Sequence, residues 1–135
     1  MPLCARHILL LPVLAGIAAC VQAGEGVTGR SDFRPDYGGI RTVLLDGDLV
    51  NFHVTMRGAR DRSDVDAYGR CAAAQYALIR GAGFARHVRT QVAETGGNWR
   101  GDAVYTISAA LPPGVATIDA EVAVRDCAAQ GIPTV

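Results

Sequence analysis

Residues 48–57 alternate apolar and polar side chains, without a break from Val50 onward, and this pattern most limits what the chain can fold into. Successive positions fall on opposite faces, with Val50, Phe52, Val54 and Met56 against Asn51, His53, Thr55 and Arg57. A period of two is typical of a β-strand that buries one face. The segment therefore predicts a sheet with one covered face and one polar face.

Four further segments have strand character. Residues 40–45 are mostly apolar and precede Asp46-Gly47, a hairpin signal. The turn residues Gly96-Gly97-Asn98 and the break Pro112-Pro113-Gly114 separate the others. The strands that we expect beside 48–57 are residues 40–45, 84–93, 102–111 and 117–125.

One stretch changes to a helical period. Between residues 63 and 79 a stripe recurs at spacings of three and four, formed by Val65, Tyr68, Ala72, Gln75, Tyr76 and Ile79. Ser63 is the expected N-cap, with Asp66 three residues later, and Gly81 ends the helix. The predicted order is ββαβββ, an α+β fold with a mainly antiparallel sheet of four to five strands and one helix packed on one face.

The predicted core follows from these two periods. The sheet is expected to bury one face against the helix stripe through Val50, Phe52, Val54, Phe84, Val88, Tyr105, Ile107, Ile118, Val122 and Val124. Strict alternation then places His87 and Arg89 together on the polar face of residues 84–93.

The N-terminus carries a second strong pattern. Arg6 precedes an apolar run over residues 8–17, and Ala18-Ala19-Cys20 closes it. A run this short cannot span about 30 Å of hydrocarbon as a helix that rises about 1.5 Å per residue. The layout predicts a secretory signal peptide. The other interpretation, a buried N-terminal helix, conflicts with Pro12 in the middle of the run.

Residues 17–20, Ile-Ala-Ala-Cys, resemble the lipobox of bacterial lipoproteins. In that family the Cys thiol receives diacylglycerol, the chain is cut before the Cys, and the new amine is acylated. The resemblance implies that Cys20 is the lipidated first residue of the mature chain. Val21, in place of an Asp, implies the periplasmic side of the outer membrane rather than the inner membrane.

The chain is then expected to divide into three parts. Residues 1–19 form the lipoprotein signal peptide, and residues 20–39, rich in Gly, form a lipid-anchored flexible tether. Residues 40–135 form a single α+β domain. Residues 68–78, with Gly83-Phe84 after them, resemble small uncharacterised lipoproteins of Gram-negative bacteria. That resemblance implies no activity and no catalytic residue.

Cysteine use fits an oxidising compartment. Cys4 would leave with the signal peptide and Cys20 would carry lipid, which leaves Cys71 and Cys127. A disulfide between them would close a loop of about 56 residues and contribute about 4 kcal/mol in the chain-entropy model. The alternative is two separately buried free thiols.

Charge excludes several classes of function. The 13 basic residues are all arginine and are balanced by 13 acidic residues, so the formal net charge is zero. A neutral chain argues against a nucleic-acid partner. Because the chain has no lysine, a P-loop, a Schiff-base mechanism and a Ser-Lys dyad are excluded, and we expect no cofactor.

Four residues are candidate ligand contacts. His53 and His87 fall on polar strand faces with Arg89 nearby, and Trp99 follows a Gly-rich turn. Two imidazoles could share a site for acid–base chemistry. A zinc site needs three or four ligands, so we expect no metal and solvent-exposed histidines. Trp99 could stack on a sugar or a peptide, or it could seal the sheet edge.

Two functions remain open. The preferred one is a small lipid-anchored envelope protein, a non-enzymatic module that contacts a membrane or a periplasmic partner through its polar sheet face or an edge strand. The alternative is a small periplasmic ligand-binding or hydrolytic domain that uses His53, His87 and Arg89. A concave pocket that joins these three residues would favour the alternative.

Overall fold

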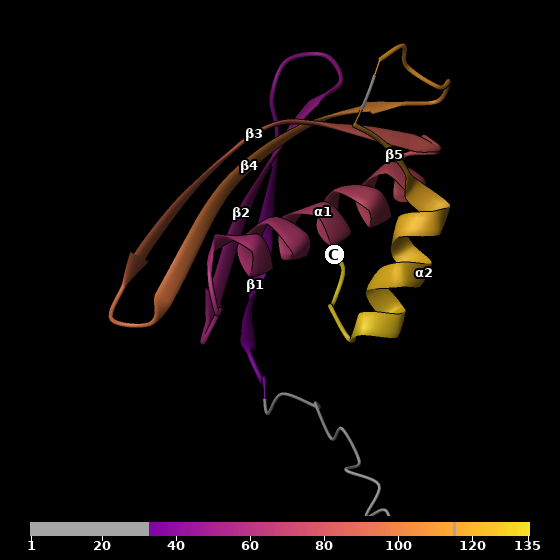
Figure 1. Ribbon diagram of the computed structural model, residues 1–135. Coiled ribbons are helices and arrows are strands. Elements are labelled where there is room, and N and C mark those ends of the chain that lie inside the picture. Colours follow the sequence, from indigo (N-terminus) through magenta and orange to yellow (C-terminus); the bar gives the residue numbers. More distant parts are fainter. Residues whose placement is uncertain (1–32, 115) are drawn as a thin grey trace, which may run out of the picture. The chain divides into compact units, whose positions relative to one another are not determined.

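The computed structural model describes residues 33–114 and 116–135, which form a five-stranded sheet and two helices (Figure 1). In chain order the elements are β1 (Asp36–Leu44), β2 (Leu49–Arg57), α1 (Arg62–Ile79), β3 (Phe84–Thr95), β4 (Asn98–Ser108), β5 (Thr117–Asp119) and α2 (Ala120–Gln130). Neighbouring strands are antiparallel, in the order β1-β2-β4-β3-β5. The α+β class and the antiparallel sheet are confirmed, whereas the single expected helix is one of two in the described residues.

The sheet is built from two hairpins. β1 pairs with β2, and β3 turns back through Gly96-Gly97 into β4. Both glycines have positive φ, 57° and 81°, as the central residues of a two-residue hairpin turn require. α1 carries the chain from β2 to β3, and β4 returns to lie between these two strands. The sheet curls, and α1 lies on its concave side (Figure 1).

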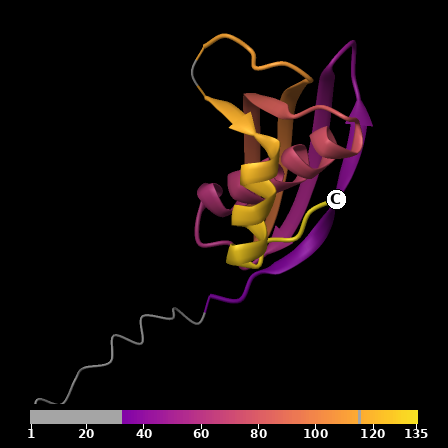
Figure 2. The ribbon, with the colours of Figure 1, turned by 90° about the vertical axis from the view of Figure 1, so that its right-hand side faces the viewer.

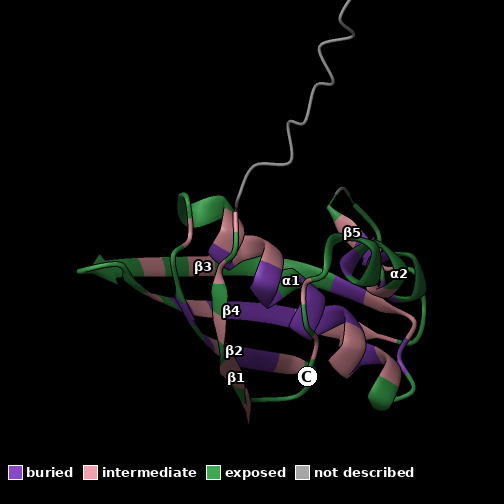
Figure 3. Cartoon of the chain, turned by 90° about the horizontal axis from the view of Figure 1, so that it is seen from below, coloured by how far each residue is buried: buried purple, intermediate pink, exposed green. Residues whose placement is uncertain are grey.

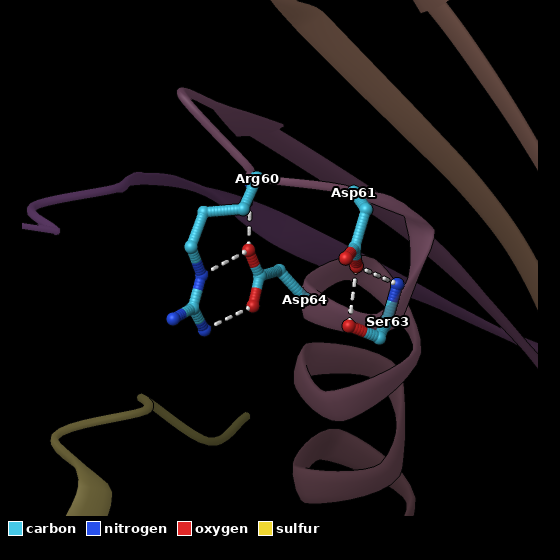
Figure 4. Close-up of polar contacts among 4 residues, drawn as sticks. All are labelled: Arg60, Asp61, Ser63 and Asp64. Atoms are coloured by element: carbon cyan, nitrogen blue, oxygen red, sulfur yellow. Dashed lines mark hydrogen bonds and ion pairs between the residues drawn. The ribbon is translucent and has the colours of Figure 1, made fainter.

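Helix α1 begins before the Ser63 cap predicted from the sequence. Asp61 is the N-cap, and its Oδ1 accepts a hydrogen bond from the Ser63 backbone N–H at 2.8 Å. Arg60 binds Asp64 through both carboxylate oxygens, at 3.1 Å from Nε and 2.7 Å from Nη2 (Figure 4). Hydrogen bonds from Ser63 lower the pKa of Asp61, and those from Arg60 lower the pKa of Asp64. Local polar contacts therefore fix where the helix starts.

The buried face of α1 consists mostly of small residues from Gly69 onward, which lets the helix approach the sheet closely. Its fully buried alanines are Ala72, Ala73, Ala74 and Ala77. Glycine stands where the contact is tightest. A Cβ on Gly69 would lie 3.3 Å from Ala103 Cβ, and a Cβ on Gly101 would lie 2.6 Å from Val65 Cγ1. A side chain at Gly101 would force the helix away from the strands, whereas a methyl at Gly69 would make only a tight contact.

The core lies between α1 and the concave face of the sheet, where the buried residues gather (Figure 3). The rings of Tyr76 and Tyr105 meet that of Phe52 edge to face, with centroids 5.7 and 5.9 Å away. A second cluster, the Met56 cluster, contains Val54, Met56, Val65 and Tyr68. Burial is confirmed for the predicted residues Val50, Phe52, Val54, Tyr105 and Ile118, and Phe84, Ile107 and Val124 are half-buried.

The segment 117–125, predicted to be a strand, is mostly helical. Only Thr117–Asp119 pairs with β3, and α2 follows. Asp119 Oδ1 accepts a hydrogen bond from the Val122 backbone N–H at 3.1 Å, which caps the new helix. Val122, predicted to be buried, is 43% exposed because the helical period turns it away from the core. α2 packs mainly against α1 (Figure 2).

A bulge in β3 reverses the faces that were predicted for the residues in the first half of this strand. His87 pairs with Tyr105 and Arg89 pairs with Val104, so Val88 is the extra residue between them. Val88, predicted to be buried, is 52% exposed. Because successive strand residues alternate between faces, the extra residue puts His87 on the concave face and leaves Arg89 on the outer one.

A disulfide joins the two helices. Cys71 on α1 bonds to Cys127 on α2, with their Cα atoms 5.9 Å apart and both residues buried. The predicted pairing is confirmed. The helical course of residues 120–130, rather than a strand, brings Cys127 to α1.

The folded region extends beyond the predicted boundary at residue 40. β1 begins at Asp36, within the segment 20–39 that was expected to be a tether, and pairs there with Arg57. The predicted signal peptide and Cys20 lie outside the described residues. No helix in residues 33–114 and 116–135 is long and apolar enough to span a membrane.

Candidate functional site

A cavity of about 380 Å³, here called the concave pocket, opens beside α1 on the helix-bearing face of the sheet. Its walls come from α1, β3, β4, β5 and the residue before β5. The residues that line it are Asp66, Arg70, His87, Tyr105, Ala116, Thr117 and Ile118. This volume lies in the range of small-molecule sites, and the lining combines charged, aromatic and apolar groups.

Helical spacing and the β3 bulge bring the polar groups of the concave pocket together. Asp66 and Arg70 are four residues apart on α1 and so project from the same side. His87 reaches this face because of the bulge, and its ring meets that of Tyr105 edge to face, with centroids 5.1 Å apart. His87 Nε2 also lies 2.7 Å from Thr90 Oγ1, a hydrogen bond that fixes the ring orientation.

Burial and charge set the chemistry of these groups. Burial raises the pKa of Tyr105, and the negative charge of Asp66 raises it further, so the hydroxyl stays protonated and can donate a hydrogen bond. Asp66 Oδ2 lies 3.6 Å from Arg62 Nε, while Oδ1 is buried without a hydrogen-bond partner. Arg70 is exposed, and none of the ion pairs found in the described part of the chain includes it.

Two predicted contact residues lie on the outer face of the sheet instead. His53 on β2 is the cross-strand partner of Asp102 on β4. Asp102 Oδ1 accepts a hydrogen bond from Asn51 Nδ2 and lies 3.5 Å from Arg89 Nη1. Asn51, Asp102 and Arg89 therefore form a polar network across β2, β4 and β3. This network binds the strands to one another and leaves no unpaired carboxylate at His53.

The structure thus divides the predicted contacts between two faces. His87 lines the concave pocket, whereas His53 lines a separate hollow beside β1 and Arg89 pairs with Asp102. Trp99 is half-buried and packs against the Met56 cluster, but it lies on β4, between β2 and β3, and not on an edge strand. The three residues His53, His87 and Arg89 are not brought into one pocket.

Asp66, Arg70 and Tyr105 are the pocket residues that sequence reasoning missed. One signal was available, because Arg62, Asp66 and Arg70 recur every four residues and so line one side of a helix. Tyr105 is predicted only as a core residue, and its place beside His87 depends on the bulge. Within residues 33–114 and 116–135, no three His, Cys, Asp or Glu side chains gather closely enough to hold a metal ion.

Comparison with known proteins places the folded region in a family. The chain is similar to an "Uncharacterized 26.9 kDa protein in nqo8 5'region" of Paracoccus denitrificans, with 34% identity over 85 residues. That match covers 63% of this chain and 33% of the relative, so it spans about a third of the relative's length. No solved structure matches the chain. Residues 37–131, which run from β1 to the end of α2, match the family described as the YNQ4 C-terminal domain, and the chain belongs to that family.

Proposed function

We propose that this chain is a small lipid-anchored envelope protein, held by Cys20 on the periplasmic side of the outer membrane, and that its folded domain acts by binding rather than by catalysis. The observation that carries the proposal is the bonded pair Cys71 and Cys127. Disulfides persist in oxidising compartments and are rare in the cytosol. The short apolar run that ends in Ala18-Ala19-Cys20 supports the same location.

The membrane is the partner that this proposal requires. Two or more acyl chains on Cys20 would give stable anchoring, where a single chain binds only marginally. The β1 strand begins at Asp36, so residues 21–35 would separate the lipid from the sheet. A domain held in this way meets its ligand or partner close to the membrane surface.

Replacing Cys20 tests the anchor. In a Gram-negative host, wild-type chain and the matched control Cys4→Ser should incorporate labelled fatty acid and sediment with the outer membrane. Cys20→Ser should lose the label and either stall as the longer precursor or leave the membrane fraction. Unchanged mobility and membrane partition of Cys20→Ser, together with an unlabelled wild-type chain, would contradict the proposal.

A second candidate is a small periplasmic ligand-binding domain. The concave pocket favours it, since this pocket joins His87 to the polar residues Asp66, Arg70 and Tyr105. His53 and Arg89 are not part of this site, because both lie on the outer face of the sheet. Saturable binding of a small molecule to wild-type chain, weakened by Tyr105→Phe, would support this function, and equal binding to both chains would refute it.

A further inference from the structure

We propose that the concave pocket binds a small organic anion, a carboxylate or a phosphate ester, with Arg70 as its cationic anchor and Tyr105 and His87 as further polar contacts. The proposal rests on the ligand-binding candidate and is independent of the lipid at Cys20.

Of the charged side chains on one side of α1, Arg70 is the cation that is available to a ligand. Arg62, Asp66 and Arg70 lie on the same side of the helix at intervals of four residues. Arg62 Nε lies 3.6 Å from Asp66 Oδ2, so one oxygen of this carboxylate has a cationic partner, while Oδ1 is buried without a hydrogen-bond partner. Arg70 lines the pocket and takes part in none of the ion pairs found in the described residues. A guanidinium binds carboxylate or phosphate oxygens through a planar fork of N–H donors.

The sheet side of the pocket adds a neutral donor. Tyr105 is 2% exposed, and its raised pKa keeps the hydroxyl protonated. A neutral hydroxyl can donate to an anion without the repulsion that a phenolate would add. The exposed His87 ring meets the ring of Tyr105 edge to face, and its Nε2 is hydrogen-bonded to Thr90 Oγ1, so the imidazole is oriented before a ligand arrives. Fixed contacts lower the entropy cost of binding.

The remaining wall of the pocket, formed by Ala116, Thr117 and Ile118, is mostly apolar and limits the size of the ligand, although Thr117 Oγ1 is buried there without a hydrogen-bond partner. Ile118 is 6% exposed, and Ala116 lies beside it with φ of 67°. Residues other than glycine rarely adopt this backbone conformation, and such residues cluster at ligand sites. A volume of about 380 Å³ admits a short aliphatic chain or a small ring in addition to the anionic group.

Four probes test the charge preference of the pocket. The full chain, purified in detergent with its disulfide intact, would be titrated by calorimetry with butyrate, butyramide, butylammonium and inorganic phosphate. Butyrate and butyramide have nearly the same shape and differ in charge, and butylammonium carries the opposite charge on a chain of four carbons. We expect saturable binding of butyrate and phosphate, and about tenfold weaker binding of butyramide, because charge-assisted hydrogen bonds are roughly twice as strong as neutral ones. The ratio of butyrate to phosphate affinity then assigns the carboxylate or the phosphate class.

Three variants test the residues. Arg70→Gln should weaken butyrate binding about tenfold, since it removes a charge-assisted contact. Arg125→Gln, at an exposed position on α2, changes the net charge equally and should leave binding unchanged. Tyr105→Phe keeps the ring and removes the hydroxyl, so it should weaken binding by a smaller factor. Thermal unfolding shows whether each variant is folded. If Arg70→Gln does not fold, Tyr105→Phe still tests the site.

Three results would overturn the proposal. Tighter binding of butylammonium than of butyrate would assign the pocket to cations through Asp66. Equal binding of butyrate and butyramide, or an Arg70→Gln effect no larger than that of Arg125→Gln, would remove Arg70 as the anchor. No saturation by any probe at millimolar concentration would exclude the site. None of these results depends on acylation of Cys20, so failure here is distinct from failure of the anchor.

Discussion

Replacing Gly101 with alanine tests the closest contact between α1 and the sheet. A Cβ at this position would lie 2.6 Å from Val65 Cγ1 and 3.3 Å from Val54 Cβ. Carbon atoms in favourable contact lie about 3.5–4.0 Å apart, so the new methyl overlaps Val65 by roughly 1 Å. Val65 is fully buried, and a helical valine has one strongly preferred χ1 rotamer. The side chain cannot turn away, so the helix itself must move.

The expected magnitude follows from two opposing effects. Overpacking a core in this way costs about 1–3 kcal/mol, and replacing a strand glycine by alanine returns roughly 0.5–1 kcal/mol of backbone entropy. We expect Gly101→Ala to lower the free energy of unfolding by about 1–2 kcal/mol. In the double variant with Val65→Ala, the new methyl enters space that the valine has vacated. The double variant should therefore be about 1–2 kcal/mol more stable than the sum of the single effects.

Urea unfolding with the disulfide intact, followed by circular dichroism, measures all members of this cycle. Gly69→Ala on α1 is the matched control. Its Cβ would lie 3.3 Å from Ala103 Cβ, and alanine gains about 1 kcal/mol of helix propensity, so the net change should be near zero. Additivity of Gly101→Ala and Val65→Ala within about 0.3 kcal/mol would show that α1 does not contact the sheet at Gly101.

Two further measurements probe the disulfide and the start of α1. The Cys71–Cys127 bond spans a sequence separation of 56, so the variant with both cysteines replaced by alanine should lose about 2–5 kcal/mol in the same urea assay. A loss below about 1 kcal/mol would contradict this. Asp61 and Asp64 have lowered pKa values, so the stability that they contribute is present above about pH 4 and is lost as the pH falls through their folded-state pKa values. Asp64→Asn should flatten the decline of the melting temperature in acid, and an unchanged slope would exclude the Arg60 pair as its source.

The elements whose buried face appears as a regular period of apolar residues in the sequence were predictable. β2 occupies Leu49–Arg57, within one residue of the predicted segment, because a strand covered on one face shows that face at every second position. α1 ends at Ile79, where its stripe ends. Only its cap differs, since Asp61 and Ser63 are both good N-cap residues and their competition is decided by hydrogen bonds in the folded chain.

α2 was not predictable from periodicity. Ile118, Val122 and Val124 satisfy a period of two, so the segment that contains them also fits a strand. Two contacts in the folded chain favour a helix instead. Asp119 caps its first turn, and Cys127 must reach Cys71 on α1. Tertiary contacts of this kind routinely override local propensity.

The candidate site depends on Val88, the extra residue in β3, which a period of two in the sequence does not reveal. Residues 84–93 contain no glycine or proline that would mark a bulge. The pairing of β3 with β4 is nevertheless fixed from both ends, by the turn at Gly96-Gly97 and by burial of Ala85 opposite Ile107. These two registers differ by one residue, and Val88 absorbs the difference as a bulge. The mismatch turns His87 toward Tyr105 and leaves Arg89 with Asp102. The concave pocket therefore acquires its imidazole because the register set at the turn and the register set at Ala85 differ by one residue, and a change that moves the bulge to a position before His87 would turn this side chain to the outer face.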